Sequence, residues 1–597
     1  MNLLWPWGSP EIAAFDPAGG ASYLDALRPR FCISSGRKVG GVPIVKGTVV
    51  FLVRFFGLAA GTIAALASLQ FFNATAMAQD AGPVTKGGTL IYLEQQSHTN
   101  LYPPAGGFYP NSGVLNQITD KLTYQNPKTL EIEPWIAESW TVNADATEYT
   151  FKIRPGVTFS DGTPVDAAAV AKNFDVYGLG DKALKHPVSE VITNYKGSEV
   201  IDPLTVKFLF TKPSVGFLQG TSVIGSGLVS LKTLALPDEA LGDATKIIGS
   251  GPFVVASEVL GRELVLTARK DYAWGPAKLA HQGPANLDGI KYVVTPEDSV
   301  RIGALLAGQA QVIRQVQAYD EKQVLAKNFV IYAPPTRGVN NSVVFRPDSP
   351  LVADLRVRQA LLHATNAKEI VATLFSANYP QAKSIIASTA QGYVDLSAKL
   401  TYDPALAAKL LDEAGWTMGP KGVRQKDGKE LVLAAYESPP QPQNKETLQL
   451  VAQQWAKVGV KLNVLAGDAG SRVVDSLDPL KTPVAPAMVG RADPDVIRSQ
   501  YYPTTRNVLL QKGGVSTKVQ TFVDDKLNTL LEGIAAETDK AKRLALVADV
   551  QNYVIDQAYT IPIFEEPQAF AASPRLKGFA FEAVGRPSFY AVWLAPK

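Results

Sequence analysis

Short stretches with alternating apolar and polar residues predict β-strands at several points along the chain. The first reads TLIYL and follows Lys86-Gly87-Gly88. In a second, Tyr149, Phe151 and Ile153 alternate with polar residues. The segment that follows, IRPGVTFSDGTPVDAAAVAKNF (153–174), contains two glycine turns, and Asp166 precedes its alanine-rich run as a helix cap. We interpret this segment as scaffold, because its glycine spacing matches no phosphate-binding loop.

Other stretches repeat with the period of a helix, and their ends carry helix signals. LRVRQALLHATNAKEIVATLF places four apolar residues on one face, Val357, Ala360, Leu361 and Ala364. Asn366 with Glu369 predicts a capping box for a second helix. YDPALAAKLLDEAGW has Asp403 at the cap and Gly415 at the end. Lys426-Asp427-Gly428-Lys429 predicts a hairpin turn between GVRQ and LVLAAY. The chain is therefore mixed α/β.

Size and composition favour a large folded protein of more than one lobe. The chain has 597 residues, with 46% hydrophobic and 19% charged residues. Six basic and three acidic residues among the first 78 account for the whole net charge of +3. The rest is balanced and has no long basic run, so we expect no nucleic-acid binding.

The leader resembles an export signal. Lys46 and Arg54 precede an apolar core that ends near Phe72, and Ala76-Met77-Ala78 fits a signal peptidase site. We expect a leader over 1–78 with its signal peptide at 46–78, and cleavage before Gln79. An uncleaved membrane anchor is the alternative. Residues 1–45 fit no signal, and we interpret them as an extension upstream of initiation near residues 45–50.

Residues for catalysis or metal binding form no recognisable pattern. The only cysteine, Cys32, lies in the leader, so the exported chain has no disulfide, thiol nucleophile or lipid-carrying cysteine. The four histidines have no metal-ligand spacing. Glu565 and Glu566 are adjacent, so on a strand they face opposite sides. We expect no catalytic residues, no metal and no cofactor.

Seven segments, in this order, resemble the family 5 solute-binding proteins of ABC importers, the oligopeptide, dipeptide and nickel class. They are the scaffold segment above, IIGSGPF (247–253), ARKDYAW (268–274), ALLAGQAQV (304–312), DLRVRQALLHATNAKEIV (354–371), YDPALAAKLLDEAGW (402–416) and YTIPIF (559–564). The resemblance implies a two-lobed α/β periplasmic binding protein (type II, cluster C-like) with an additional subdomain in the first lobe. The implied segments are 84–125, 248–330 and 560–597 for lobe I, 126–247 for the extra subdomain, and 331–559 for lobe II.

The same resemblance suggests where the solute binds. Peptide-binding members carry an aspartate for the peptide ammonium before a DPD-like sequence, and in MVGRADPDVIRSQYYP (488–503) that position is Gly490. Arg491 instead suggests an acidic or carbonyl-bearing ligand. The alternatives are that Arg491 simply pairs with Asp493 or Asp495, or that one of these aspartates takes over the ammonium role.

Two further segments supply candidate contacts. Arg337 and Asn340 precede the strand expected to enter the second lobe, where family members often contact solute, although turn chemistry and solvated charge are the alternative. Polar and aromatic groups at the exit of the first strand are suited to orienting a ligand: Gln95, Gln96, Tyr109 and Asn111.

The resemblance implies a periplasmic receptor of a Gram-negative bacterium. It would capture a peptide-like or other small organic solute and deliver it, as a monomer, to an inner-membrane ABC permease and its ATPase subunits. Two alternatives are a secreted hydrolase acting on peptides or sugars and a periplasmic holdase chaperone. The absence of a nucleophile constellation disfavours the first, and no exposed amphipathic or Met-rich segment recommends the second.

Overall fold

The structure, a computed structural model, describes residues 83–596 except 439–440, 468–473, 476–477 and 504–521. The expected leader, signal segment and cleavage site lie outside the described residues. No helix in the described ranges is long and apolar enough to cross a membrane.

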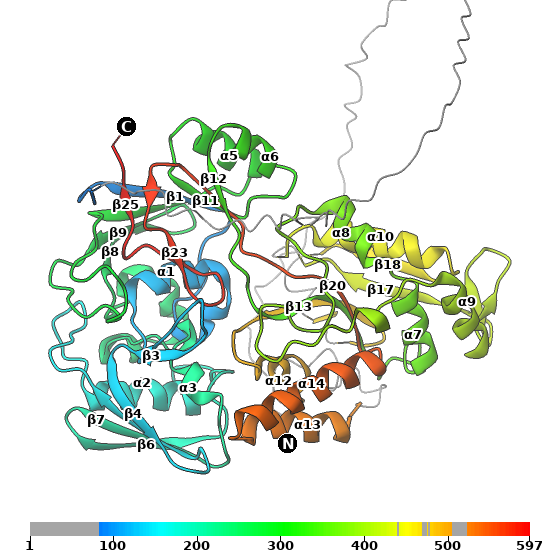
Figure 1. Cartoon of the computed structure of the whole chain (residues 1–597), viewed down its shortest axis with the longest axis horizontal. Helices are drawn as coiled ribbons and strands as arrows, with labels where there is room; N and C mark the ends of the chain where they lie inside the picture. Colours follow the sequence, from blue (N-terminus) through cyan, green and yellow to red (C-terminus); the bar gives the residue numbers. More distant parts are fainter. Residues whose placement is uncertain (1–82, 439–440, 468–473, 476–477, 504–521, 597) are drawn as a thin grey trace, which may run out of the picture. The chain divides into compact units, whose positions relative to one another are not determined.

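The first lobe is built on a mixed seven-stranded sheet (Figure 1). Its central strand β1 pairs in parallel with β10 and β11, and the remaining pairs are antiparallel. In sheet order the strands are β12 (Val330–Tyr332), β21 (Phe570–Ala572), β11 (Val312–Arg314), β1 (Thr89–Glu94), β10 (Gly289–Val294), β9 (Glu263–Ala268) and β8 (Phe253–Val259). Its helices are α1 (Tyr109–Ile118), preceded by the 3-10 turn η1 (Pro103–Gly107), α5 (Asp298–Leu306) and α6 (Glu321–Ala326). The predicted strand TLIYL is confirmed as β1.

The segment between β1 and β8 adds a four-stranded antiparallel sheet. Its order is β4 (Ala137–Val142), β5 (Glu148–Ile153), β7 (Thr205–Phe210) and β6 (Tyr195–Asp202), with helix α2 (Ala167–Leu179) packed on it. Tyr149, Phe151 and Ile153 are all buried on β5, as the alternation predicts. The Asp166 side chain accepts a hydrogen bond from Ala169 N and caps α2. The two glycine turns and the helix cap predicted in residues 153–174 are confirmed. Smaller elements here are β2 (Thr123–Gln125), β3 (Ile132–Pro134), α3 (Phe217–Gly220), η2 (Ile224–Ser226), α4 (Leu231–Leu234), η3 (Asp238–Gly242) and η4 (Ala244–Lys246).

The second lobe combines a small sheet with most of the helices. The sheet has the order β19 (Val484–Gly490), β13 (Gly338–Phe345) and β20 (Thr560–Phe564), and β17 (Val432–Tyr436) pairs in parallel with β18 (Lys461–Leu465). The helices are α7 (Leu355–His363), α8 (Ala367–Leu374), α9 (Pro404–Glu413), α10 (Asn444–Ala456), α12 (Val496–Tyr501), α13 (Asp525–Ala536) and α14 (Lys540–Asp556), with the short turn η5 (Ser397–Lys399). The four apolar residues predicted for one face of α7 are fully buried.

The helix caps agree with the sequence, and the hairpin needs one correction. Asn366 and Asp403 cap α8 and α9 as predicted. Asp427 and Gly428 form a left-handed turn with φ of 51° and 74°. This turn joins β15 (Arg424–Lys426) to the two-residue β16 (Lys429–Glu430), which lie beside β14 (Thr417–Met418). The strand in LVLAAY is β17, and it pairs with β18 rather than across the hairpin, because its apolar residues are buried under α10 and the neighbouring strands.

Two crossover segments connect the lobes and run side by side. The chain leaves β12 for β13 through residues 333–337 and returns from β20 to β21 through residues 565–569. Thr336 N donates to Glu566 O at 3.1 Å and Gln568 N donates to Pro334 O at 2.8 Å. The sequence predicted that the chain returns to lobe I at residue 560. In the structure β20 is buried and pairs with β13 of the second-lobe sheet, so this boundary lies later in the chain. The return falls after Phe564. Four short strands end the chain, β22 (Leu576–Lys577), β23 (Ala580–Phe581), β24 (Pro587–Ser588) and β25 (Trp593–Leu594).

Candidate functional site

An open pocket of about 1060 Å³ lies where segments of both lobes meet the extra subdomain. The first lobe contributes the residues between η1 and α1, and the second lobe contributes the end of β19. The return crossover contributes Glu566, and the turn between β23 and β24 contributes Val584 and Arg586. The first two groups are Pro104, Gly107, Phe108 and Tyr109, and Met488, Val489, Gly490 and Arg491. The remaining lining comes from Ser189, Glu190, Val191, Val223, Ile224, Gly225, Ser438 and Gln441. A concave, mixed polar and apolar lining suits a small organic ligand.

Arg491 lies in this pocket directly after β19. Its side chain is 6% exposed, and its Nη2 donates to Asp495 Oδ2 at 3.1 Å. Its Nη1 is buried and has no hydrogen-bond partner among the described residues. Arg491 therefore forms an ion pair with a neighbouring acid, as one of the alternatives predicted. The guanidinium keeps one group of donors available, so pairing and ligand contact are compatible.

The two aspartates of the DPD turn are engaged within the fold and do not line the pocket. Asp493 Oδ1 lies 2.6 Å from Nη2 of Arg543, and it also accepts from Asp495 N at 2.8 Å. Burial by itself would raise the pKa of Asp493, but the charge and hydrogen bonds of Arg543 outweigh it and lower that pKa. Burial raises the pKa of Asp495 despite the neighbouring Arg491. Neither carboxylate is placed to hold a ligand ammonium in this pocket.

Tyr109 begins α1 and separates the pocket from a smaller one of about 470 Å³. Its hydroxyl donates to Val584 O at 3.0 Å, and burial raises its pKa. The smaller pocket also includes Gln96 and shares Glu566 with the larger one. Gln95 lies just after β1, where its backbone N donates to Glu94 Oε1 at 2.9 Å. The exit of the first strand thus reaches the site region through Gln96 and Tyr109.

Three predicted contacts have their side chains in internal hydrogen bonds. Asn111 is 2% exposed; its Oδ1 accepts from Thr99 N and its Nδ2 donates to Ala105 O. Asn340 donates to Ser384 O at 2.9 Å. Arg337 donates to the carbonyls of Ala583 and Pro127, and its φ of 44° marks the turn before β13. None of the three lines the interlobe pocket. Arg337 lies in a turn, as its turn alternative expects, whereas Asn340 is buried within β13.

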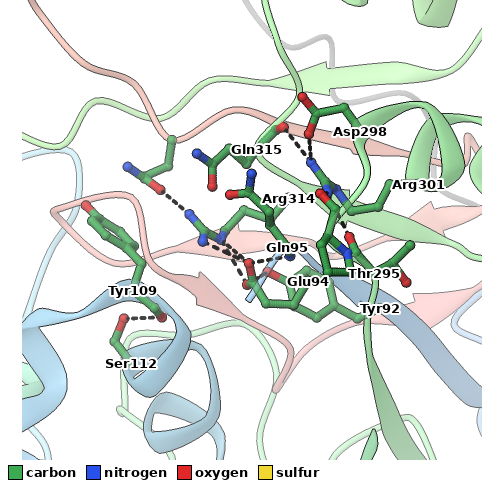
Figure 2. Close-up of polar contacts among 12 residues, drawn as sticks. Tyr92, Glu94, Gln95, Tyr109, Ser112, Thr295, Asp298, Arg301, Arg314 and Gln315 are labelled. Atoms are coloured by element: carbon green, nitrogen blue, oxygen red, sulfur yellow. Dashed lines mark hydrogen bonds and ion pairs between the residues drawn. The ribbon is translucent and has the colours of Figure 1, made fainter. Parts of the chain in front are cut away.

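Beside Tyr109, the first lobe contains a charged network whose members bond one another within the fold (Figure 2). Arg314 Nε lies 2.9 Å from both carboxylate oxygens of Glu94, and Tyr92 donates to Glu94 Oε2 at 2.8 Å. Arg314 Nη1 also donates to Gln568 Oε1 in the return crossover. The guanidinium of Arg314 is 5.7 Å from the Tyr109 ring centre. This network ties β1 and β11 to the crossover and positions Tyr109 by stacking.

Sequence reasoning missed three charged residues of the pocket, Glu190, Glu566 and Arg586. Glu566 Oε2 accepts from Asn341 Nδ2 at 2.6 Å, Oε1 accepts from Gln568 Nε2 at 3.0 Å, and burial raises its pKa to about 7. Its neighbour Glu565 bonds Ser388 instead, so the two carboxyls point to different partners as their adjacency predicts. The sequence signal that could have identified Glu566 was its position shortly after the apolar strand YTIPIF. Arg586 had no comparable local signal.

The lining carries charged groups of both signs. None of its described residues is His, Cys or Lys, and its charged groups are Arg491, Arg586, Glu190 and Glu566. These provide fixed donors and acceptors in a partly buried setting, where charge-assisted hydrogen bonds are strong. The arrangement can orient a zwitterionic or acidic molecule between the lobes.

Comparison with known proteins agrees with this geometry. The model of the bacterial extracellular solute-binding proteins, family 5 (middle), matches residues 131–508. A glutathione-binding protein of Salmonella paratyphi A is 27% identical over 521 residues, covering 84% of this chain and 93% of the relative. The glutathione-binding protein of Escherichia coli strain K12 is 28% identical over 495 residues, covering 79% and 88%.

Solved structures share the fold at lower sequence identity. NikA from Brucella suis in complex with Fe(III)-EDTA has a TM-score of 0.70 at 23% identity, covering 85% of this chain and 100% of that one. DppA from Helicobacter pylori in complex with the peptide STSA has a TM-score of 0.70 at 20% identity, covering 86% and 99%. The family model spans more than half of the chain and the fold is the two-lobed one of these proteins. The chain therefore belongs to family 5 of the bacterial extracellular solute-binding proteins.

Proposed function

We propose that this protein is the periplasmic receptor of an ABC importer. It captures a peptide-like or other small organic solute between its lobes and delivers it, as a monomer, to an inner-membrane permease driven by ATPase subunits. It carries out no reaction on the solute and needs no cofactor. Family membership supports the receptor role.

The observation that carries this proposal is the lining of the interlobe pocket. It combines Arg491 from the second lobe, Arg586 and Tyr109 from the first, and Glu566 from the crossover. A solute that contacts all of these bridges the lobes and the segment between them. Its binding would favour the closed arrangement, which is the form a permease can distinguish from the empty receptor.

The solute we propose is a peptide-like acid. Relatives are named for binding glutathione, a tripeptide with two carboxylates and one ammonium group. The pocket offers matching charges, since Arg491 and Arg586 suit carboxylates and Glu566 suits an ammonium. With Gly490 in place of an aspartate, we expect free dipeptides that depend on an amino-terminal anchor to bind weakly.

The hydrolase and holdase alternatives predict different behaviour. A hydrolase would release product, and a holdase would suppress aggregation of other proteins without a ligand-dependent rise in Tm.

The test is a ligand panel on the purified mature chain. Tm and product formation are recorded with glutathione, di- and tripeptides, γ-glutamyl peptides and sugars. We expect a saturable rise in Tm with a glutathione-like acid and no product. Product formation that one point mutation abolishes would establish a hydrolase. No Tm response to any member, together with suppressed aggregation of a client, would establish a holdase.

A further inference from the structure

Arg586 is a buried cation for which the described part of the chain provides no carboxylate. It follows the turn between β23 and β24, where Glu582 N donates to its carbonyl at 2.9 Å. The side chain is 6% exposed, and none of the ion pairs among the described residues includes it. Its Nη2 makes only a long hydrogen bond of 3.5 Å to Gly106 O, and its Nε has no partner.

The acidic side chains around Arg586 make hydrogen bonds or ion pairs with other residues. Glu582 forms an ion pair with Lys121 at 2.5 Å. Asp120 accepts from Tyr272 and Trp274. Glu566, in the same pocket as Arg586, accepts from two amides. A buried guanidinium without a counter-charge is costly, and its five donors are mostly unused here.

Three other buried arginines have the counter-charge that Arg586 lacks. Arg314 lies against Glu94 at 2.8 Å and Arg543 against Asp493 at 2.6 Å. Arg491 has Asp495 at 3.1 Å. Arg358, which is also buried, forms no ion pair with a carboxylate among the described residues but donates to three backbone carbonyls. Arg586 has neither arrangement, and its missing counter-charge points to a group from outside the chain.

Arg586 also occupies a junction between two pockets. It lines the interlobe pocket and a second one of about 800 Å³ inside the first lobe, and the two share Val223 and Val584 as well. The second pocket, called the aromatic pocket below, has five aromatic residues in its lining, Tyr124, Trp135, Tyr272, Phe581 and Tyr590. The guanidinium centre lies 5.3 Å from the Tyr109 ring centre, which holds it in place without neutralising it.

We propose that Arg586 receives a carboxylate of the solute, at the point where the interlobe pocket meets the aromatic pocket of the first lobe. This assignment rests on the proposed receptor function and names the substrate class as carboxylic acids. The carboxylate takes the unused donors of the guanidinium and supplies the missing counter-charge. Since Arg491 comes from the second lobe, a solute with two carboxylates engages one guanidinium from each lobe.

The test uses simple carboxylates, so it does not depend on the identity of the natural solute. Tm is measured in equal concentrations of sodium acetate, sodium glutarate, sodium chloride and acetamide, for the mature chain and for Arg586→Met, Arg586→Lys and Arg543→Met. We expect acetate and glutarate to raise the Tm of the unmodified chain by about 1–3 °C above chloride, and acetamide to have no effect. Arg586→Met should abolish the rise, and Arg586→Lys should keep part of it.

The ligand-free Tm distinguishes a ligand-binding cation from a structural one. Arg543→Met should lower it, because Asp493 is left buried without its partner, whereas Arg586→Met should not. The proposal is overturned if carboxylates give no specific rise, if the rise survives in Arg586→Met, or if Arg586→Met loses as much stability as Arg543→Met. A positive peptide panel combined with any of these results would keep the receptor function and remove only the role of Arg586.

Discussion

Arginine side chains around the cleft differ in what neutralises them, and this decides what each substitution should do. Arg491 pairs with Asp495 through Nη2, while its Nη1 has no hydrogen-bond partner among the described residues. Arg337 donates to backbone carbonyls and does not line the pocket. Arg586 lines the pocket without an acid. Residue type alone makes these three look equivalent, and only their partners separate them.

We expect Arg491→Ala to weaken binding of a solute found with the ligand panel by roughly ten-fold to a hundred-fold, as the loss of a charge-assisted hydrogen bond predicts. It should also destabilise the fold by about 1–3 kcal/mol, because Asp495 is left buried without its partner. Titration calorimetry and urea unfolding measure the two effects.

The double substitution Arg491→Ala/Asp495→Asn separates the two roles. It should recover stability and leave affinity low, since the unpaired acid is gone but the ligand contact is still missing. Recovery of affinity together with stability would reduce Arg491 to a structural residue. Arg337→Ala is the matched control, and we expect it to change affinity by less than about 0.5 kcal/mol.

Glu566 makes stability depend on pH in a definite direction. Its folded pKa of about 7 lies above the ordinary value of 4.5, so the folded chain holds the proton more tightly than the unfolded chain. The stability that this proton provides is fully present below the ordinary pKa and is lost as pH rises through the folded pKa. Glu566→Gln should therefore gain about 1–3 kcal/mol of unfolding free energy relative to the unmodified chain between about pH 4.5 and about pH 8.

The measurement is urea unfolding across that pH window. Asp120, whose pKa burial raises to about 7, titrates in the same range, so the difference between variant and unmodified chain is the informative quantity. Glu131→Gln, at an exposed position, is the control for the loss of a carboxylate. Parallel stability curves for Glu566→Gln and the unmodified chain would contradict the burial of this carboxyl.

At the scale of elements, local signals predicted helix ends and faces well, and strand partners poorly. Asp166, Asn366 and Asp403 each cap the helix that the sequence predicts, because a cap needs only donors two or three residues away. Local signals did not predict how the two crossover segments pair. Their hydrogen bonds join residues more than two hundred positions apart, as between Thr336 and Glu566. Such pairing places the acid of the return segment next to the turn before β13.

At the scale of the whole molecule, the described residues belong to one compact unit, and the export leader stays a prediction from the sequence. Within the described residues both lobes and the extra subdomain surround the interlobe pocket. The family is extracellular, and we propose that the periplasm is its location in this case. The leader lies outside the described residues, so this part of the proposal depends on the sequence.

We expect the periplasmic form to begin at Gln79, because Ala76-Met77-Ala78 follows a basic and then an apolar segment. Mass spectrometry of the native protein should give the mass of residues 79–597. Since Cys32 is the only cysteine, the mature form should not react with maleimide. A native mass that includes residues 46–78 would instead establish the retained anchor.

Spacing and apolar periodicity along the chain were enough to predict the α/β class and the principal helix caps, and the resemblance of seven segments implied the family and its two lobes. The sequence also singled out Tyr109 and Arg491, which line the interlobe pocket, and their contact with a solute stays a prediction. The chemistry of the pocket was decided by the tertiary structure. Asp493 meets Arg543 fifty residues away, and Glu566 and Arg586 meet Tyr109 across more than four hundred. Whether a charged side chain is neutralised or left for a ligand depends on such distant partners, which local spacing does not encode.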